Sequence, residues 1–126
     1  MFTILVLDAD KLIRWSIREL FSPEDSLVHE AESAEAALYL LRNSSYSMIF
    51  ADFDLIDESE EELMGKIAGI QMDSKIVIMT SRTKQQTLDK IQDFSPYAVV
   101  EKPFKTEELK SIAKAALDLN RSKTNL

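Results

Sequence analysis

The hydrophobic positions along the chain fall into two alternating patterns. Five short, mainly apolar runs predict strands; they cover residues 3–7, 27–31, 48–51, 75–79 and 98–101. The first run has no polar alternation, which is typical of a strand buried on both faces of a parallel sheet. Each run is followed by a segment whose apolar residues recur at helical spacing, which predicts an amphipathic helix. These segments are residues 11–21, 34–42, a stretch containing Leu63 and Ile67, residues 84–94, and a stretch that begins at Thr106.

This alternation of five strands with five helices predicts a single α/β domain, in which a parallel sheet is covered by helices on both faces. Right-handed crossovers restrict the topology to a few doubly wound arrangements. Residues 1–119 carry the pattern, whereas residues 120–126 are polar and aperiodic, which indicates a C-terminal tail or the start of a linker. Ligands of doubly wound sheets bind outside the carboxyl ends of the strands. Any chemistry is therefore expected where the strands end.

Composition narrows the classes of function. The 126 residues carry a net charge of −7 with acidic and basic residues intermixed, so direct binding of nucleic acid by this chain is not expected. There is no cysteine, which excludes disulfides and thiolate metal sites. No apolar run approaches the roughly 20 residues that span a bilayer, and no basic region precedes the N-terminal apolar run. These features predict a cytoplasmic protein without membrane association.

Charged and hydroxyl side chains stand where four of the predicted strands end. Asp8 follows the first strand, Asp52 the third, Thr80 the fourth and Lys102 the fifth. Each alone is typical of a turn residue, a helix cap or a solvated charge, but chance rarely places all of them at the ends of separate strands. Crowded carboxylates need a cation, and magnesium suits them because it prefers oxygen ligands. A carboxylate can also attack phosphorus and become an aspartyl phosphate.

Four short stretches give the chain a family resemblance. Residues 4–14 read ILVLDADKLIR, residues 48–52 read MIFAD, and residues 76–81 and 99–104 read IVIMTS and VVEKPF. With this spacing, residues 3–119 resemble the receiver domain of two-component response regulators. The resemblance implies a flavodoxin-like three-layer sandwich of the (βα)5 type, with a parallel sheet in the strand order 2-1-3-4-5.

The resemblance also implies a function in phosphorelay signal transduction. Asp52 would accept a phosphoryl group from the phosphohistidine of a histidine kinase or a phosphotransfer protein. Lys102, the Thr80 hydroxyl and the backbone N–H of Ser81 would bind the phosphoryl group, with Thr80 moving towards it. The fourth helix, fifth strand and fifth helix would form the surface for partners or for a homodimer. Such a domain is not an enzyme, apart from slow self-dephosphorylation.

A metal site and an unusual peptide bond are implied in the same way. Mg2+ would be held by the side chains of Asp8 and Asp52 and by the backbone carbonyl of Asp54. The peptide bond between Lys102 and Pro103 would be cis, which a following proline permits.

The chain departs from the family pattern around the acidic pocket. Ala9 stands at the border of the site, where the family has a second acid that binds magnesium directly, so weakened or lost Mg2+ binding is expected. Asp10, one residue later, would be a further metal ligand if the loop geometry differs. The loop after Asp52 contains neither proline nor glycine, which predicts a rebuilt loop and an earlier start of the third helix.

Two further positions bear on how such a site would be regulated. Val99 occupies the switch position, where the family often has an aromatic residue that moves inward on activation. The coupling between phosphate and the output face is therefore expected to be altered. Arg82 and Asp54 border the site, and an ion pair between them would gate the access of water.

Two other functions stay open on the sequence alone. A degenerate receiver would keep the fold but act as a phosphorylation-independent interaction module, as Ala9 and Val99 favour. A haloacid-dehalogenase-like phosphatase would use Asp8 as nucleophile and Asp10 as general acid. That class needs a further acidic metal-binding motif after the lysine, whereas the acids after Lys102 all lie in one predicted helix.

Overall fold

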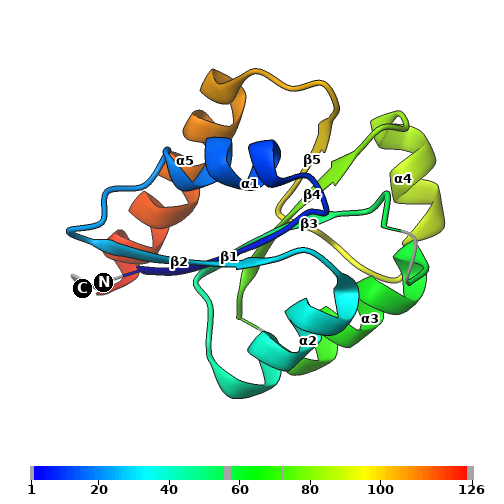
Figure 1. Ribbon diagram of the computed structural model, residues 1–126, viewed down its shortest axis with the longest axis horizontal. Coiled ribbons are helices and arrows are strands. Elements are labelled where there is room, and N and C mark those ends of the chain that lie inside the picture. Colours follow the sequence, from blue (N-terminus) through cyan, green and yellow to red (C-terminus); the bar gives the residue numbers. More distant parts are fainter. Residues whose placement is uncertain (1, 56–57, 72, 125–126) are drawn as a thin grey trace.

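Five parallel strands form one sheet in the order β2-β1-β3-β4-β5 in the computed structural model, which describes residues 2–55, 58–71 and 73–124 (Figure 1). The strands are β1 (Phe2–Leu7), β2 (Ser26–Ala31), β3 (Met48–Asp52), β4 (Lys75–Thr80) and β5 (Ala98–Glu101). The helices are α1 (Lys11–Arg18), α2 (Ala34–Asn43), α3 (Glu60–Ile70), α4 (Lys84–Lys90) and α5 (Thr106–Thr124). The predicted α/β class and the strand order are therefore confirmed.

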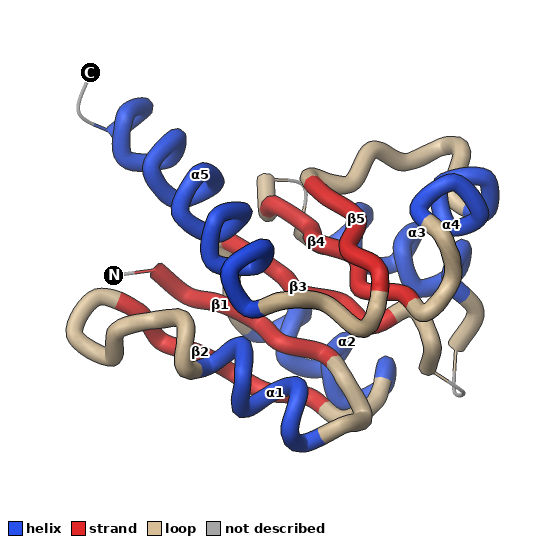
Figure 2. The backbone as a smooth tube through the Cα atoms, turned by 90° about the horizontal axis from the view of Figure 1, so that it is seen from above, coloured by secondary structure: helices blue, strands red, loops and turns tan. Residues whose placement is uncertain are grey.

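Two hydrophobic cores lie on opposite faces of the sheet, because successive side chains of a strand point to opposite sides. Leu5 and Leu7 of β1 belong to the core under α2 and α3, whereas Ile4 and Val6 belong to the core under α1 and α5. Figures 1 and 2 show these two pairs of helices on either side of the strands. Every residue of β3 is buried, which explains why the central runs show no polar alternation.

Polar side chains begin the first four helices. Asp10, Ser33, Ser59 and Thr83 each accept a hydrogen bond from a backbone N–H in the first turn of the following helix. Such caps satisfy donors that have no partner within the helix. Thr83 also forms a reciprocal capping box with Gln86. The caps at Asp10 and Thr83 fix the loops that follow β1 and β4, at the edge where the predicted site lies.

Two helices end earlier than the periodicity predicts. α1 ends at Arg18 rather than at residue 21, and α4 ends at Lys90 rather than at residue 94. In both places the backbone continues with tighter hydrogen bonds between residues three apart. The tighter turn lets the next large side chains reach the core: Phe21 packs edge-to-face on Phe50, with ring centroids 6.1 Å apart, and Phe94 packs against the core under α2 and α3.

The start of α3 and the end of α5 are the other two helix boundaries to compare. α3 begins at Glu60 and is capped by Ser59; its earlier start relative to the family pattern stays a prediction. Residues 56 and 57 of that loop lie outside the described part. α5 continues to Thr124, into the segment predicted as a tail. No glycine or proline follows Pro103, so nothing in the local sequence stops the helix.

Candidate functional site

The predicted site residues come together at the carboxyl edge of the sheet. β1, β3 and β4 are neighbours, and the register pairs Leu7 with Ala51 and Asp52 with Met79. Asp8 and Asp52 therefore emerge side by side, next to the end of β4 at Thr80. All three side chains are buried, with exposed fractions of 1%, 4% and 1%. This grouping was predicted from the sequence.

Lys102 supplies the positive charge between the two carboxylates. Its Nζ donates to Oδ2 of Asp8 at 2.9 Å and to Oδ1 of Asp52 at 3.1 Å, and it lies 3.8 Å from Oδ2 of Asp54. The N–H of Lys102 also donates to the carbonyl of Thr80, which fixes the start of this loop against β4. The peptide bond between Lys102 and Pro103 is cis, as the resemblance implied.

Burial and charge shift the proton equilibria of this group. Burial raises the pKa of Asp52 above its ordinary value of 3.8, and the charge of Asp8 adds to this effect. The N–H of Asp54 and the ammonium of Lys102 oppose that rise without cancelling it. Burial alone would lower the pKa of Lys102, but its hydrogen bonds and charge interactions with both carboxylates outweigh burial and raise it. Lys102 therefore stays charged at neutral pH.

Backbone N–H groups hold each carboxylate from its own loop. The N–H of Asp10 donates to Oδ1 of Asp8 at 2.8 Å, and the N–H of Asp54 donates to Oδ1 of Asp52 at 2.9 Å. Oδ1 of Asp52 thus accepts from both Asp54 and Lys102. Among the described residues, Oδ2 of Asp52 receives no hydrogen bond. This oxygen atom is the one available for chemistry.

The prediction that Asp10 reaches into the pocket is wrong. Its side chain is exposed and caps α1, where it accepts a hydrogen bond from the N–H of Leu12 at 2.9 Å. Ala9 is exposed at the same turn. The helix N-terminus offers unpaired donors to a carboxylate, so Asp10 turns to the helix and away from Asp8.

Few carboxylates of the pocket could hold a metal ion. Among residues 2–55, 58–71 and 73–124, no group of three or more acidic, histidine or cysteine side chains is placed to hold a metal. Asp8 and Asp52 are the two adjacent carboxylates of the pocket. Magnesium is commonly held by one or two carboxylates and otherwise by water and substrate oxygens. The pair therefore fits magnesium, with one protein ligand fewer than a pocket that has an acid at position 9.

Arg82 contacts a different partner from the one predicted. Its guanidinium pairs with Glu60 of α3 at 3.0 Å, and no ion pair with Asp54 occurs among the described residues. Asp54 instead accepts a hydrogen bond from the N–H of Ser81 at 3.0 Å and faces Lys102. The position of Glu60 at the first turn of α3 explains the correction, because it lies within reach of Arg82.

Thr80 makes a contact that the sequence analysis missed. Its Oγ1 accepts a hydrogen bond from the N–H of Arg82 at 3.1 Å and another from the hydroxyl of Thr87 at 3.1 Å. Thr87 lies in α4 and is only 3% exposed. A threonine in a helix rich in polar residues gives little signal, because its burial depends on how α4 packs against the end of β4.

Arg14 is a second residue that the sequence analysis missed. Its Nη1 donates to the backbone carbonyl of Asp8 at 2.8 Å and to that of Ala9 at 3.3 Å. Glu30 of β2 holds the same guanidinium at 3.0 Å and that of Arg18 at 2.7 Å. Two arginines one helical turn apart, with an acid on the adjacent strand, are the signal that was available in the sequence. Arg14 therefore ties the loop that carries Asp8 to both α1 and β2.

Val99 lies in β5, where its backbone is paired with Ile78. The small side chain leaves a groove of about 510 Å³ between α4, β5 and α5. Its apolar lining includes Leu88, Phe94 and Ile112. The partner surface implied by the resemblance is therefore hollowed at the switch position.

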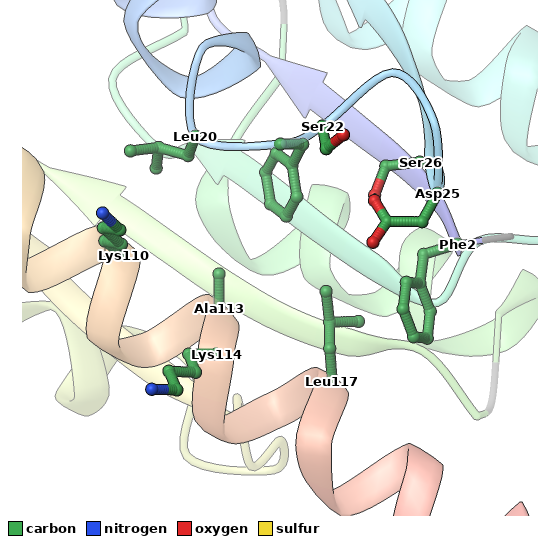
Figure 3. A pocket seen from close by; sticks show the side chains of 10 residues that line it. Phe2, Leu20, Ser22, Asp25, Ser26, Lys110, Ala113, Lys114 and Leu117 are labelled. Atoms are coloured by element: carbon green, nitrogen blue, oxygen red, sulfur yellow. The ribbon is translucent and has the colours of Figure 1, made fainter.

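A second groove lies away from the acidic pocket. Figure 3 shows Phe2, at the start of β1, and Ala113 and Leu117 of α5 lining a hollow of about 280 Å³, with Lys110 and Lys114 on the same helix. Phe2 stands at the opposite end of β1 from Leu7, so this groove lies at the amino edge of the sheet. None of the predicted site residues lines it.

The chain matches known proteins along most of its length. A family model described as the response regulator receiver domain matches residues 4–114. The DNA-binding transcriptional regulator NtrC of Azospirillum brasilense is 29% identical over 94% of this chain, and the sensory transduction protein LytR of Staphylococcus epidermidis is 27% identical over 94%. The chain covers only 24% and 48% of the lengths of these two relatives.

Solved structures agree on the fold. A CheY-like receiver domain from Methanospirillum hungatei superposes with a TM-score of 0.86 at 22% identity, over 98% of both chains. A two-component response regulator from Clostridium difficile gives a TM-score of 0.84 at 24% identity, over 94% of this chain and 97% of that one. No helix in the described part is long and apolar enough to cross a membrane. On the family match over residues 4–114, the chain belongs to the response regulator receiver domain family.

Proposed function

We propose that this receiver domain accepts a phosphoryl group on Asp52 from a phosphohistidine of a histidine kinase or phosphotransfer protein. The observation that carries the proposal is the position of Asp52: a buried carboxylate at the end of β3, 3.1 Å from the ammonium of Lys102. Phosphoryl transfer asks the protein mainly for positioning and for neutralisation of charge. The pocket offers both at one oxygen atom.

The available oxygen of Asp52 defines the direction of attack. Oδ1 is held by Asp54 and Lys102, so Oδ2 forms the new bond to phosphorus. As that bond forms, the bond between phosphorus and the histidine nitrogen breaks, and the leaving imidazole keeps the electron pair and takes up a proton from solvent. Lys102 stays beside the aspartyl phosphate and offsets its charge.

Three further groups would receive the phosphoryl oxygens. Thr80 lies at the adjacent strand end, and its own hydroxyl proton is available because its oxygen accepts two hydrogen bonds. The N–H of Ser81 is held by Asp54, so it reaches a phosphoryl oxygen only after that carboxylate withdraws. Mg2+ bound by Asp8 and Asp52 would supply further positive charge for the phosphoryl oxygens.

The test is incubation with acetyl phosphate and magnesium, followed by intact-mass measurement. Wild type should gain the mass of one phosphoryl group, and Asp52→Asn should gain none. Asp54→Asn is the matched control, because it removes a neighbouring acid from the same loop and should still be modified. Modification of Asp52→Asn to the same extent as wild type would refute the assignment of Asp52.

A phosphorylation-independent interaction module is the second candidate. Ala9 removes one magnesium ligand, and Lys102 bridges Asp8 and Asp52 at 2.9 and 3.1 Å. On this alternative the pocket is a structural ion pair, and the surface around α4, β5 and α5 binds a partner constitutively. Absence of any added mass on wild type, at saturating acetyl phosphate and magnesium, would favour this candidate over the first.

A further inference from the structure

The hydroxyl groups of Thr80 and Thr87 form a buried pair between β4 and α4. Their Oγ1 atoms are 3.1 Å apart, and the two side chains are 1% and 3% exposed. Among the described residues, the Thr87 hydroxyl makes no other side-chain hydrogen bond, so Thr80 is the acceptor that satisfies it. A buried hydroxyl that loses its acceptor becomes an unsatisfied hydrogen-bond donor, which destabilises the structure. A movement of the Thr80 side chain would therefore break a hydrogen bond donated by α4.

Two of the polar contacts that hold the ends of α4 are weak. The helix has seven residues, from Lys84 to Lys90. Its N-terminus is held by the N–H of Lys84, which donates to Glu101 at 3.0 Å, and its C-terminus by an ion pair of Lys90 with Glu60 at 3.9 Å. Both contacts are at the surface, where such interactions contribute little. The groove beside Val99 gives the helix room on its apolar side.

We propose that Thr87 is a positioning residue that couples occupancy of Asp52 to α4, by losing its hydrogen bond to Thr80 when the Thr80 side chain moves to a phosphoryl group. This inference rests on the proposed function. The unmodified state keeps Thr80 tethered to α4, and phosphorylation exchanges that tether for a charge-assisted hydrogen bond to a phosphoryl oxygen. The freed Thr87 hydroxyl must then find another acceptor, and we expect α4 to shift as this hydrogen bond is replaced. The relay takes the place of an aromatic side chain, which Val99 cannot provide.

The test uses beryllium fluoride with magnesium as a phosphoryl analogue on the whole chain. Binding is measured by calorimetry, and the response of α4 by the amide chemical shifts of residues 84–90. Thr87→Val keeps the shape of the side chain but removes the tether, so the analogue should bind about fivefold more tightly, the equivalent of ~1 kcal/mol for one hydrogen bond. The shift changes in α4 should shrink at the same time. Thr87→Ser keeps a hydroxyl and should behave like wild type in both readouts.

A double-mutant cycle separates the relay from a general packing effect. In a Thr80→Ala background there is no hydroxyl to release, so Thr87→Val should change neither the affinity nor the α4 shifts. Equal or weaker binding by Thr87→Val, or the same effect with and without Thr80, would overturn the relay while leaving phosphorylation of Asp52 intact. No binding of the analogue by wild type would overturn both the relay and the proposed function.

Discussion

Removing the ammonium of Lys102 should destabilise the fold as well as the site. Lys102→Met keeps most of the aliphatic stem but leaves Asp8 and Asp52, both nearly inaccessible to solvent, facing each other without a counter-charge. Removal of one partner from a buried ion pair costs about 3–5 kcal/mol. Lys102 keeps a side-chain exposure of 17%, and Asp52 can take up a proton, and both reduce the loss. We expect the free energy of unfolding to fall by about 2–3 kcal/mol at neutral pH.

The assay is urea unfolding followed by circular dichroism, with a thermal melt in parallel. For a domain of this size the expected loss lowers Tm by roughly 10 °C. Lys105→Met, a change at an exposed neighbour, is the matched control and should alter stability by less than about 0.5 kcal/mol.

The pH dependence tests the physical cause of that loss. The raised pKa of Asp52 means that the folded state binds a proton more readily than the unfolded state, so this carboxylate adds stability at low pH and loses it as pH rises through its folded pKa. Without Lys102 this effect grows. The loss in free energy of unfolding caused by Lys102→Met should therefore shrink as pH falls towards the ordinary aspartate pKa of 3.8. If Lys102→Met is as stable as wild type at neutral pH, or loses as much stability in acid as at neutral pH, uncompensated carboxylate charge is not the cause.

Two further predictions concern the loop after β1. Asp10→Ala should lower the free energy of unfolding by about 1 kcal/mol through loss of the α1 cap, with magnesium affinity unchanged in a calorimetric titration. Asp10→Asn should restore most of the stability, and a large loss of magnesium affinity in both variants would make Asp10 a ligand after all. Burial alone would raise the pKa of Glu30, but hydrogen bonds from Arg18 and Arg14 outweigh it and lower the pKa below 4.5. Glu30→Gln should therefore cost about 1 kcal/mol at neutral pH, and the difference should vanish as pH falls through the lowered pKa; a loss that persists in acid would contradict this origin.

The sequence predicted what depends on regular patterns. Strands buried on both faces have no polar positions, so their ends were clear, and the ends of parallel strands meet at one edge. Asp8, Asp52, Thr80 and Lys102 were therefore predicted together from spacing alone. The resemblance added the cis peptide bond before Pro103, which the structure also has.

The errors concern side chains with more than one available partner. Asp10 can reach either a metal pocket or a helix N-terminus, and the unpaired N–H groups of α1 decide its direction. Arg82 pairs with Glu60, whose position depends on where α3 begins. The burial of Thr87 could not be predicted from the sequence, because the burial of a threonine in a polar helix depends on how that helix packs against its neighbours.

The lysine that neutralises the pocket follows β5, which is one of the two edge strands of the sheet. β5 has four residues and is paired on one side only, with β4, and edge strands are among the first parts of a sheet to open. A local opening of β5 would remove the ammonium while β1 and β3 keep both carboxylates in place. The electrostatic potential of the pocket therefore depends on whether β5 stays paired with β4. A partner that binds β5 and prevents its opening would keep the ammonium beside Asp52 without contacting Asp52.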